Sequence, residues 1–156
     1  MEIVYIETTI VSLLGARPSR DPIMAAHQEI TRRWWQDRRG QFHCVTSEEV
    51  LREVSLGDGE LSRLRLETLA EIPVLEVDDA ALKLAQGVLR ERILPPQAYS
   101  DAVHAAVAST HGAQVLLTWN CRHLANPLLL RKMREFMNVR GLTLPEVCTP
   151  IEFGRD

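Results

Sequence analysis

The sequence predicts a three-layer α/β/α fold with a central, mainly parallel sheet of five strands, in a single domain that spans residues 1–156. Three observations predict this fold class. Short apolar segments alternate with longer segments of helical periodicity along the whole chain. Strands that are separated by helices connect through right-handed crossovers, which places them side by side and parallel, with helices on both faces. The length and a composition of 46% apolar and 25% charged residues allow one buried core, and no linker, repeat or low-complexity tract divides the chain.

Five short apolar segments are predicted as strands, because apolar and β-branched residues are concentrated in them and turn or helix signals bound them. The first is the run IVYI, directly before Glu7, and the fourth carries the run VLLTW. The five predicted strands span residues 3–6, 42–45, 73–77, 114–119 and 146–151.

Six longer segments have apolar residues at helical spacing and are predicted as helices. The first spans residues 22–39, and Gly40 ends it. Trp34 follows its apolar stripe and is expected in the core, whereas Trp35 lies off the stripe and is expected at a subunit interface. The other predicted helices span residues 46–56, 60–71, 80–92, 100–111 and 127–138.

Polar residues mark the starts of three of these helices. The run TSEE at 46–49 fits a capping box, in which the first Thr and the last Glu satisfy each other's backbone amides. Asp78 or Asp79 is expected to cap the following helix, and Ser100 the Ala-rich one, because short polar side chains accept hydrogen bonds from the first free amides of a helix.

Composition excludes several classes of protein. A formal net charge of −3 gives no global basic surface, so nucleic acid would bind through a local patch or through metal ions. The three cysteines are far apart and form no CxxC pair, so neither a zinc site nor a disulfide framework is expected, and Cys44 and Cys148 are interpreted as core residues. No signal peptide or membrane span is recognised, so a reducing cytoplasm is the expected compartment.

Acidic and amide residues fall at the predicted strand ends and helix starts. Ligands of open parallel sheets bind outside the carboxyl ends of the strands, where Glu7 and Asn120 each follow a strand directly. Glu53 borders the buried face of the helix after strand two, and Asp101 lies in the first turn of the Ala-rich helix. Each has an ordinary alternative: a solvated helix charge for Glu53, a helix-dipole partner for Asp101 and a turn residue for Asn120. Together they favour a site for a hard cation, Mg²⁺ or Mn²⁺.

Five segments of the chain resemble a known family in order and position. They are YIETTIVSLL, TSEEVLREVSLGD, YSDAVHAAVAS, LLTWNCRHLANP and VCTPIEF. In these segments the chain is similar to the PIN domain, the nuclease fold of VapC-type toxins. The resemblance implies a metal-dependent ribonuclease, with Glu7, Glu53 and Asp101 as metal ligands and Asn120 as the fourth catalytic position. It also implies an antitoxin protein as a partner and a homodimer.

Two positions depart from the family pattern, which usually has Asp where this chain has Glu7 and Asn120. The departures keep open an alternative function, a weak or inactive PIN-like module that binds RNA or protein. A phosphoryl-transfer receiver domain is a remote alternative, because it needs a second acid beside Glu7 and a Lys after a late strand.

Contacts to RNA are expected from residues around these acids. Thr8 and Thr9 follow Glu7 and are expected to orient the acids or to donate to phosphate. The other expected contacts are Arg17, Arg20, Arg122 and His123. His104 is interpreted as a packing residue or a structural hydrogen-bond partner, and no zinc-ligand spacing is present.

Overall fold

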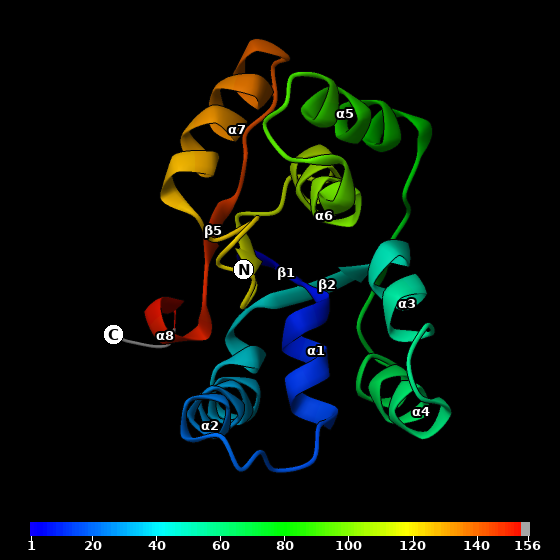
Figure 1. The fold of residues 1–156 in the computed structure, drawn as a ribbon, viewed down its shortest axis with the longest axis vertical. Coiled ribbons are helices and arrows are strands. Elements are labelled where there is room, and N and C mark those ends of the chain that lie inside the picture. The colour runs from blue at the N-terminus through cyan, green and yellow to red at the C-terminus, as the bar shows by residue number, and fades with distance from the viewer. Residues whose placement is uncertain (154–156) are drawn as a thin grey trace.

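A five-stranded sheet runs through the centre of the protein, and each pair of neighbouring strands is parallel (Figure 1). The computed structural model describes residues 1–153. Its strands, in the spatial order β3-β2-β1-β4-β5, are β1 (Ile3–Ile6), β2 (His43–Ser47), β3 (Val74–Leu75), β4 (Val115–Leu117) and β5 (Glu146–Cys148). The predicted α/β fold class is confirmed.

Helices cover both faces of this sheet. Figure 1 shows α1 and α2 on one side and α5, α6 and α7 on the other. The helices are α1 (Thr8–Gly15), α2 (Pro22–Asp37), α3 (Glu48–Val54), α4 (Gly59–Thr68), α5 (Asp79–Arg90), α6 (Tyr99–Thr110), α7 (Pro127–Val139) and α8 (Pro150–Phe153). Two short 3₁₀ turns, Arg39–Gln41 and Pro96–Ala98, precede β2 and α6.

The strand order reverses at the central strand. The chain passes from β1 to β2 and β3 on one side, and then returns to place β4 and β5 on the other side of β1. Tyr5 pairs with Leu116 in this register, and the backbone amide of Glu7 donates to the carbonyl of Leu117 at 3.2 Å. The ends of β1 and β4 therefore form the topological switch point, where ligands of parallel sheets bind.

The sequence prediction missed α1 and misplaced the C-terminal elements. The residues of α1 begin TTIV, a β-branched run with weak helix propensity, yet Ile10 and Val11 are completely buried. Burial of this face against the protein therefore outweighs local propensity. The predicted strand over 146–151 is wrong in its second half, because β5 ends at Cys148 and Pro150 opens the short helix α8.

Two predicted caps are also shifted by the structure. Thr46 lies in β2, where its hydroxyl donates to the carbonyl of Ile6 at 3.2 Å, and Ser47 caps α3 by accepting from the amide of Val50. Ser100 lies inside α6, because the preceding 3₁₀ turn leads directly into that helix. Asp78 does cap α5, through the amide of Ala81 at 2.9 Å.

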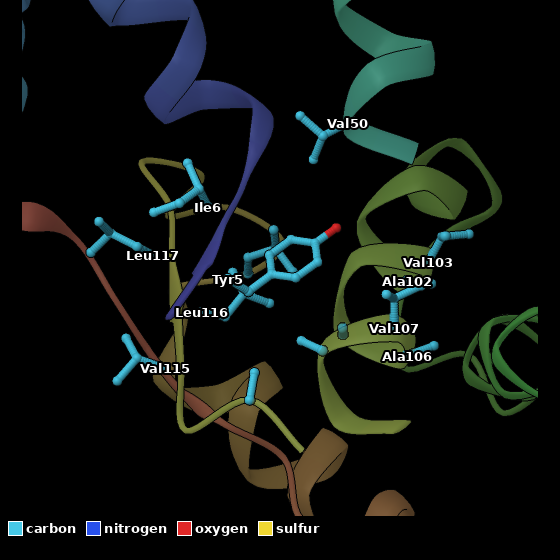
Figure 2. Packing of buried hydrophobic residues seen from close by; sticks show 14 of the residues in the cluster. Tyr5, Ile6, Val50, Ala102, Val103, Ala106, Val107, Val115, Leu116 and Leu117 are labelled. Atoms are coloured by element: carbon cyan, nitrogen blue, oxygen red, sulfur yellow. The ribbon is translucent and has the colours of Figure 1, made fainter. Parts of the chain in front are cut away.

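The core forms where α6 packs against the central strands. In Figure 2 the ring of Tyr5 points towards α6, while Ile6 and Leu117 point to the opposite side of the sheet. Ala102 and Ala106 of α6 are completely buried, and their small side chains let α6 pack closely along α5. His104, on the other side of α6, faces the sheet and hydrogen-bonds the hydroxyl of Tyr5.

Trp34 is 2% exposed and lies in the core, as predicted. Trp35 is half-buried, and the guanidinium of Arg39 lies 4.4 Å from its ring centre, so its role at a subunit interface stays a prediction.

Cys44 is buried, Cys148 is half-buried and Cys121 is exposed, and all three are free thiols. Within residues 1–153, no helix combines the length and apolar character needed to cross a bilayer.

We predict that Ala106→Leu destabilises the fold by about 1–3 kcal/mol, because the larger side chain cannot fit between α6 and α5 without strain. Gln86→Leu, on an exposed position of the neighbouring helix α5, is the matched control and should change stability by less than about 0.5 kcal/mol. Urea denaturation followed by circular dichroism measures both values. Equal stability of the two variants would contradict close packing of α6.

The three cysteines should differ in their reaction with iodoacetamide at pH 8. Burial raises the pKa of the Cys44 thiol to about 11 and that of Cys148 to about 12, so fewer than about one in a thousand of either is a thiolate at this pH. Cys121 is exposed and should be alkylated first. Peptide mass spectrometry after a short labelling pulse measures the three rates, and similar rates would contradict the burial of Cys44 and Cys148.

Candidate functional site

Glu7 lies at the centre of the site, directly after β1 and at the N-terminal cap of α1. Its side chain is almost completely buried, with 2% of the residue exposed. One carboxylate oxygen, Oε1, accepts hydrogen bonds from the hydroxyls of Thr9 and Thr118, each at 2.5 Å. Burial raises the pKa of Glu7, and the nearby His104 and these two hydroxyls oppose the rise. The protein therefore holds one oxygen of this carboxylate firmly.

The second oxygen of Glu7 faces the imidazole of His104, a completely buried residue of α6. Its Nε2 lies 3.9 Å from Glu7 Oε2 and 2.5 Å from Oε1 of Glu53. Its Nδ1 lies 2.7 Å from the hydroxyl of Tyr5, which is 2.6 Å from the hydroxyl of Ser47. Burial would lower the pKa of His104, but the hydrogen bond to Glu53 and the surrounding carboxylates outweigh it and raise that pKa.

Glu53 reaches the site from α3 and is half-buried. Its Oε1 also accepts a hydrogen bond from the hydroxyl of Thr8 at 2.6 Å. Burial would raise the pKa of Glu53, but the hydrogen bond and charge of His104 and the Thr8 hydroxyl lower it overall. Glu53 is therefore a carboxylate at neutral pH and is fixed from two sides.

Asp101 lies at the edge of this group, in the first turn of α6. One of its oxygens accepts from the side-chain amide of Asn120 at 3.0 Å, and the other lies 3.3 Å from Nδ1 of His123. Burial raises the pKa of Asp101 against the opposing effect of both histidines, and the charge of Glu53 adds to the rise. Asn120 uses its own oxygen to accept from the backbone amides of Arg122 and His123. It therefore joins Asp101 to the loop after β4.

The structure brings three of the predicted acids to one edge of the sheet and adds a histidine to them. Ligand atoms of Glu7, Glu53 and His104 all lie within 4.8 Å of one another, and Asp101 lies beside this group rather than in it. The hydroxyls of Thr8 and Thr9 donate to Glu53 and Glu7, and their contact with phosphate stays a prediction.

The predicted arginine contacts are exposed and more distant. Arg17 and Arg20 follow α1, so the length of that helix, about 12 Å, separates them from Glu7. Arg122 is exposed in the loop after β4, and His123 in the same loop contacts Asp101. Contact of these four residues with RNA stays a prediction, and for Arg17 and Arg20 it requires a substrate that extends along α1.

Three contributors to the site were not predicted as site residues. His104, interpreted as a packing residue or a structural hydrogen-bond partner, does make hydrogen bonds, to Tyr5 and Glu53, and Tyr5 reads as a core residue of β1. Thr118 stands directly before the Trp-Asn pair that ends strand four, and this position was the available signal for its role. The donor set suits a divalent cation, because the carboxylates of Glu7 and Glu53 and the imidazole of His104 offer ligand atoms within 4.8 Å of one another, with Asp101 beside them.

No family model matches the sequence, and no curated protein has a similar sequence. Solved structures do share the fold. VapC20 from Mycobacterium tuberculosis, a toxin that cleaves the sarcin-ricin loop, has a TM-score of 0.57 at 20% identity, covering 72% of this chain and 86% of that chain. VapBC2 from Rickettsia felis, bound to a DNA fragment from its promoter, has a TM-score of 0.59 at 15% identity, covering 94% and 98%. FitAcB from Neisseria gonorrhoeae has a TM-score of 0.59 at 16% identity, covering 95% and 98%.

These similarities show the fold and not the activity, since all three identities are low. The chain shares the α/β fold of these VapC and FitAcB structures. The resemblance to VapC-type PIN domains that the sequence motifs predict is confirmed for the fold.

We predict that Thr118→Val destabilises the protein by about 1–3 kcal/mol at neutral pH, because it removes one of two hydroxyls that bind a buried carboxylate. Thr143→Val, at an exposed position, is the matched control and should be close to neutral. Urea denaturation of both variants is the measurement. A Thr118→Val protein as stable as the control would show that Glu7 does not depend on this hydrogen bond.

Proposed function

We propose that the protein is a metal-dependent endoribonuclease of the PIN type. The observation that carries this proposal is the convergence of Glu7 and Glu53, from β1 and α3, at the switch point of a parallel sheet, with Asp101 of α6 beside them. Acids that are held together by hydroxyl and imidazole partners at such an edge have a clear use as cation ligands.

In this proposal Glu7, Glu53 and Asp101 hold a Mg²⁺ or Mn²⁺ ion. A bound ion of this kind lowers the pKa of a water molecule and polarises the scissile phosphate, and hydrolysis leaves a 5′-phosphate and a 3′-hydroxyl. Thr9 and Thr118 fix Glu7, and Thr8 fixes Glu53. The protein's own contribution is therefore a set of carboxylates whose positions are set before substrate arrives.

Asn120 and the loop after β4 have a positioning role in the same proposal. The amide of Asn120 holds Asp101, and its oxygen shapes the loop that carries Arg122 and His123. A neutral amide at this position removes one charge from the usual family pattern and supplies an N–H that donates to Asp101. Arg122 and His123 of this loop are the proposed RNA contacts, and the support is that His123 lies beside Asp101.

The proposal extends to a toxin that pairs with an antitoxin, works in the cytoplasm and forms a homodimer. Its support is the similarity to VapC20, a cleaving toxin, and to the VapBC structures. Co-expression with the product of an adjacent small reading frame, followed by affinity purification, tests the antitoxin partner. Light scattering of the purified protein tests the homodimer.

Purified protein should cleave RNA with Mn²⁺ or Mg²⁺, and a chelator should abolish the cleavage. Asp101→Asn should lower the rate by about 100-fold or more with little loss of fold, since it removes a charge that faces the metal. Glu60→Gln, an exposed acid of α4, is the matched control and should retain full activity. The measurements are cleavage of end-labelled RNA on gels and circular dichroism.

Two results would contradict the ribonuclease proposal. Cleavage that persists in chelator would show that no metal is needed. Failure of the wild-type protein to cleave any RNA with either metal, together with metal-independent binding of the same RNA, would favour a PIN-like binding module. The Glu and Asn at positions 7 and 120 are the features that favour this second function.

A further inference from the structure

Among Glu7, Glu53 and His104, whose ligand atoms lie close together, His104 is the one residue that an oxygen-only metal site does not need. Its ring is completely buried, and it lies between two carboxylates that approach from different elements. A buried polar ring on the Ala-rich face of a helix is costly unless its nitrogens are paired. Here both are: Nδ1 with Tyr5, and Nε2 with Glu53.

The surroundings of the ring match those of a histidine that binds metal. Ligating histidines commonly donate their second N–H to a fixed partner, which sets the tautomer and the ring orientation. Nδ1 of His104 can donate to the hydroxyl of Tyr5, whose own proton can pass to Ser47. Ser47 is in turn held by the amide of Val50, at the start of α3. This arrangement directs Nε2, rather than Nδ1, at the two glutamates.

We propose that Nε2 of His104 is a direct ligand of the metal, together with Glu7 and Glu53, so that the centre prefers a first-row transition ion such as Mn²⁺ to Mg²⁺. The inference rests on the metal centre of the proposed function. Mg²⁺ takes oxygen ligands and keeps much of its water, whereas imidazole nitrogen increases affinity for transition ions. The ion takes the place of the proton between Nε2 and Glu53, and that proton leaves to solvent.

The distances allow this exchange with small movements. Neighbouring ligands of an octahedral ion lie about 3 Å apart when each is about 2.1 Å from it. Nε2 lies 2.5 Å from Glu53 Oε1 and 3.9 Å from Glu7 Oε2. Nε2 and Glu53 Oε1 must move apart by about 0.5 Å, which a side-chain rotation of the half-buried Glu53 provides. Nε2 and Glu7 Oε2 must approach by about 0.9 Å, which requires a small shift of Glu7.

Pulsed electron paramagnetic resonance of the Mn²⁺-loaded full-length protein tests the proposal, because it detects a ¹⁴N nucleus bound to the ion. We expect imidazole nitrogen coupling in the wild-type protein and its loss in His104→Gln. The matched control is His123→Gln, which changes the other histidine near the site and should keep the coupling. Calorimetry should show Mn²⁺ binding at least about tenfold tighter than Mg²⁺, and a loss of about 10- to 100-fold in Mn²⁺ affinity for His104→Gln.

The outcomes separate this inference from the proposed function. Mn²⁺ binding without nitrogen coupling in the wild type, or coupling lost in His123→Gln alone, would overturn His104 as a ligand and leave the ribonuclease proposal intact. Nitrogen coupling without RNA cleavage would support His104 and overturn the ribonuclease. No Mn²⁺ binding at all would overturn both. If His104→Gln does not fold by circular dichroism, retained coupling in His123→Gln supports His104 and its loss there overturns the inference.

Discussion

A buried carboxylate at the end of the central strand is the constraint on which the rest of the site depends. Removing an ionised glutamate from water is costly unless hydrogen bonds or opposite charges replace the lost hydration. Glu7 receives two hydroxyl hydrogen bonds, one from its own helix α1 and one from the end of β4. The second is available only because β4 returns to pair with β1, so the topology of the sheet supplies part of the stabilisation of this acid.

The second carboxylate oxygen of Glu7, Oε2, faces a residue of α6. The helix packs closely along α5 on one side, and His104 on its other side reaches both glutamates. From His104 the hydrogen bonds continue through Tyr5 to Ser47, which caps α3, the helix that carries Glu53. The sheet, α3 and α6 are therefore joined by one polar network, and a shift of any of these elements would disturb both carboxylates.

The sequence predicts the alternating architecture and the end of β1 well, because those signals are local, whereas the ends of β2 to β5 differ from the predicted ones by two or three residues. It misses α1, whose β-branched start favours a strand and whose helical state depends on the burial of Ile10 and Val11. That omission also placed Arg17 and Arg20 nearer to Glu7 than the intervening helix allows. Glu7, Glu53, Asp101 and Asn120 were found from strand ends and family motifs, and whether they act in catalysis is untested. The sequence allows His104 a structural hydrogen bond but does not identify its partners, because Tyr5 comes from β1 and Glu53 from α3, and only the fold brings both beside α6.

The two departures from the family pattern and the buried histidine affect the metal centre in the same direction. Asn120 in place of an acid lowers the negative charge on which a strongly hydrated ion such as Mg²⁺ depends. Glu7 is longer than Asp, but its Oε1 is held by two hydroxyls, so the added length turns Oε2 towards His104. A nitrogen donor at that point compensates for the lost charge only for ions that accept imidazole. Under the proposal, the site attracts cations in general less strongly, but its ligands select more sharply among them. Glu7, His104 and Asn120 are therefore parts of one arrangement.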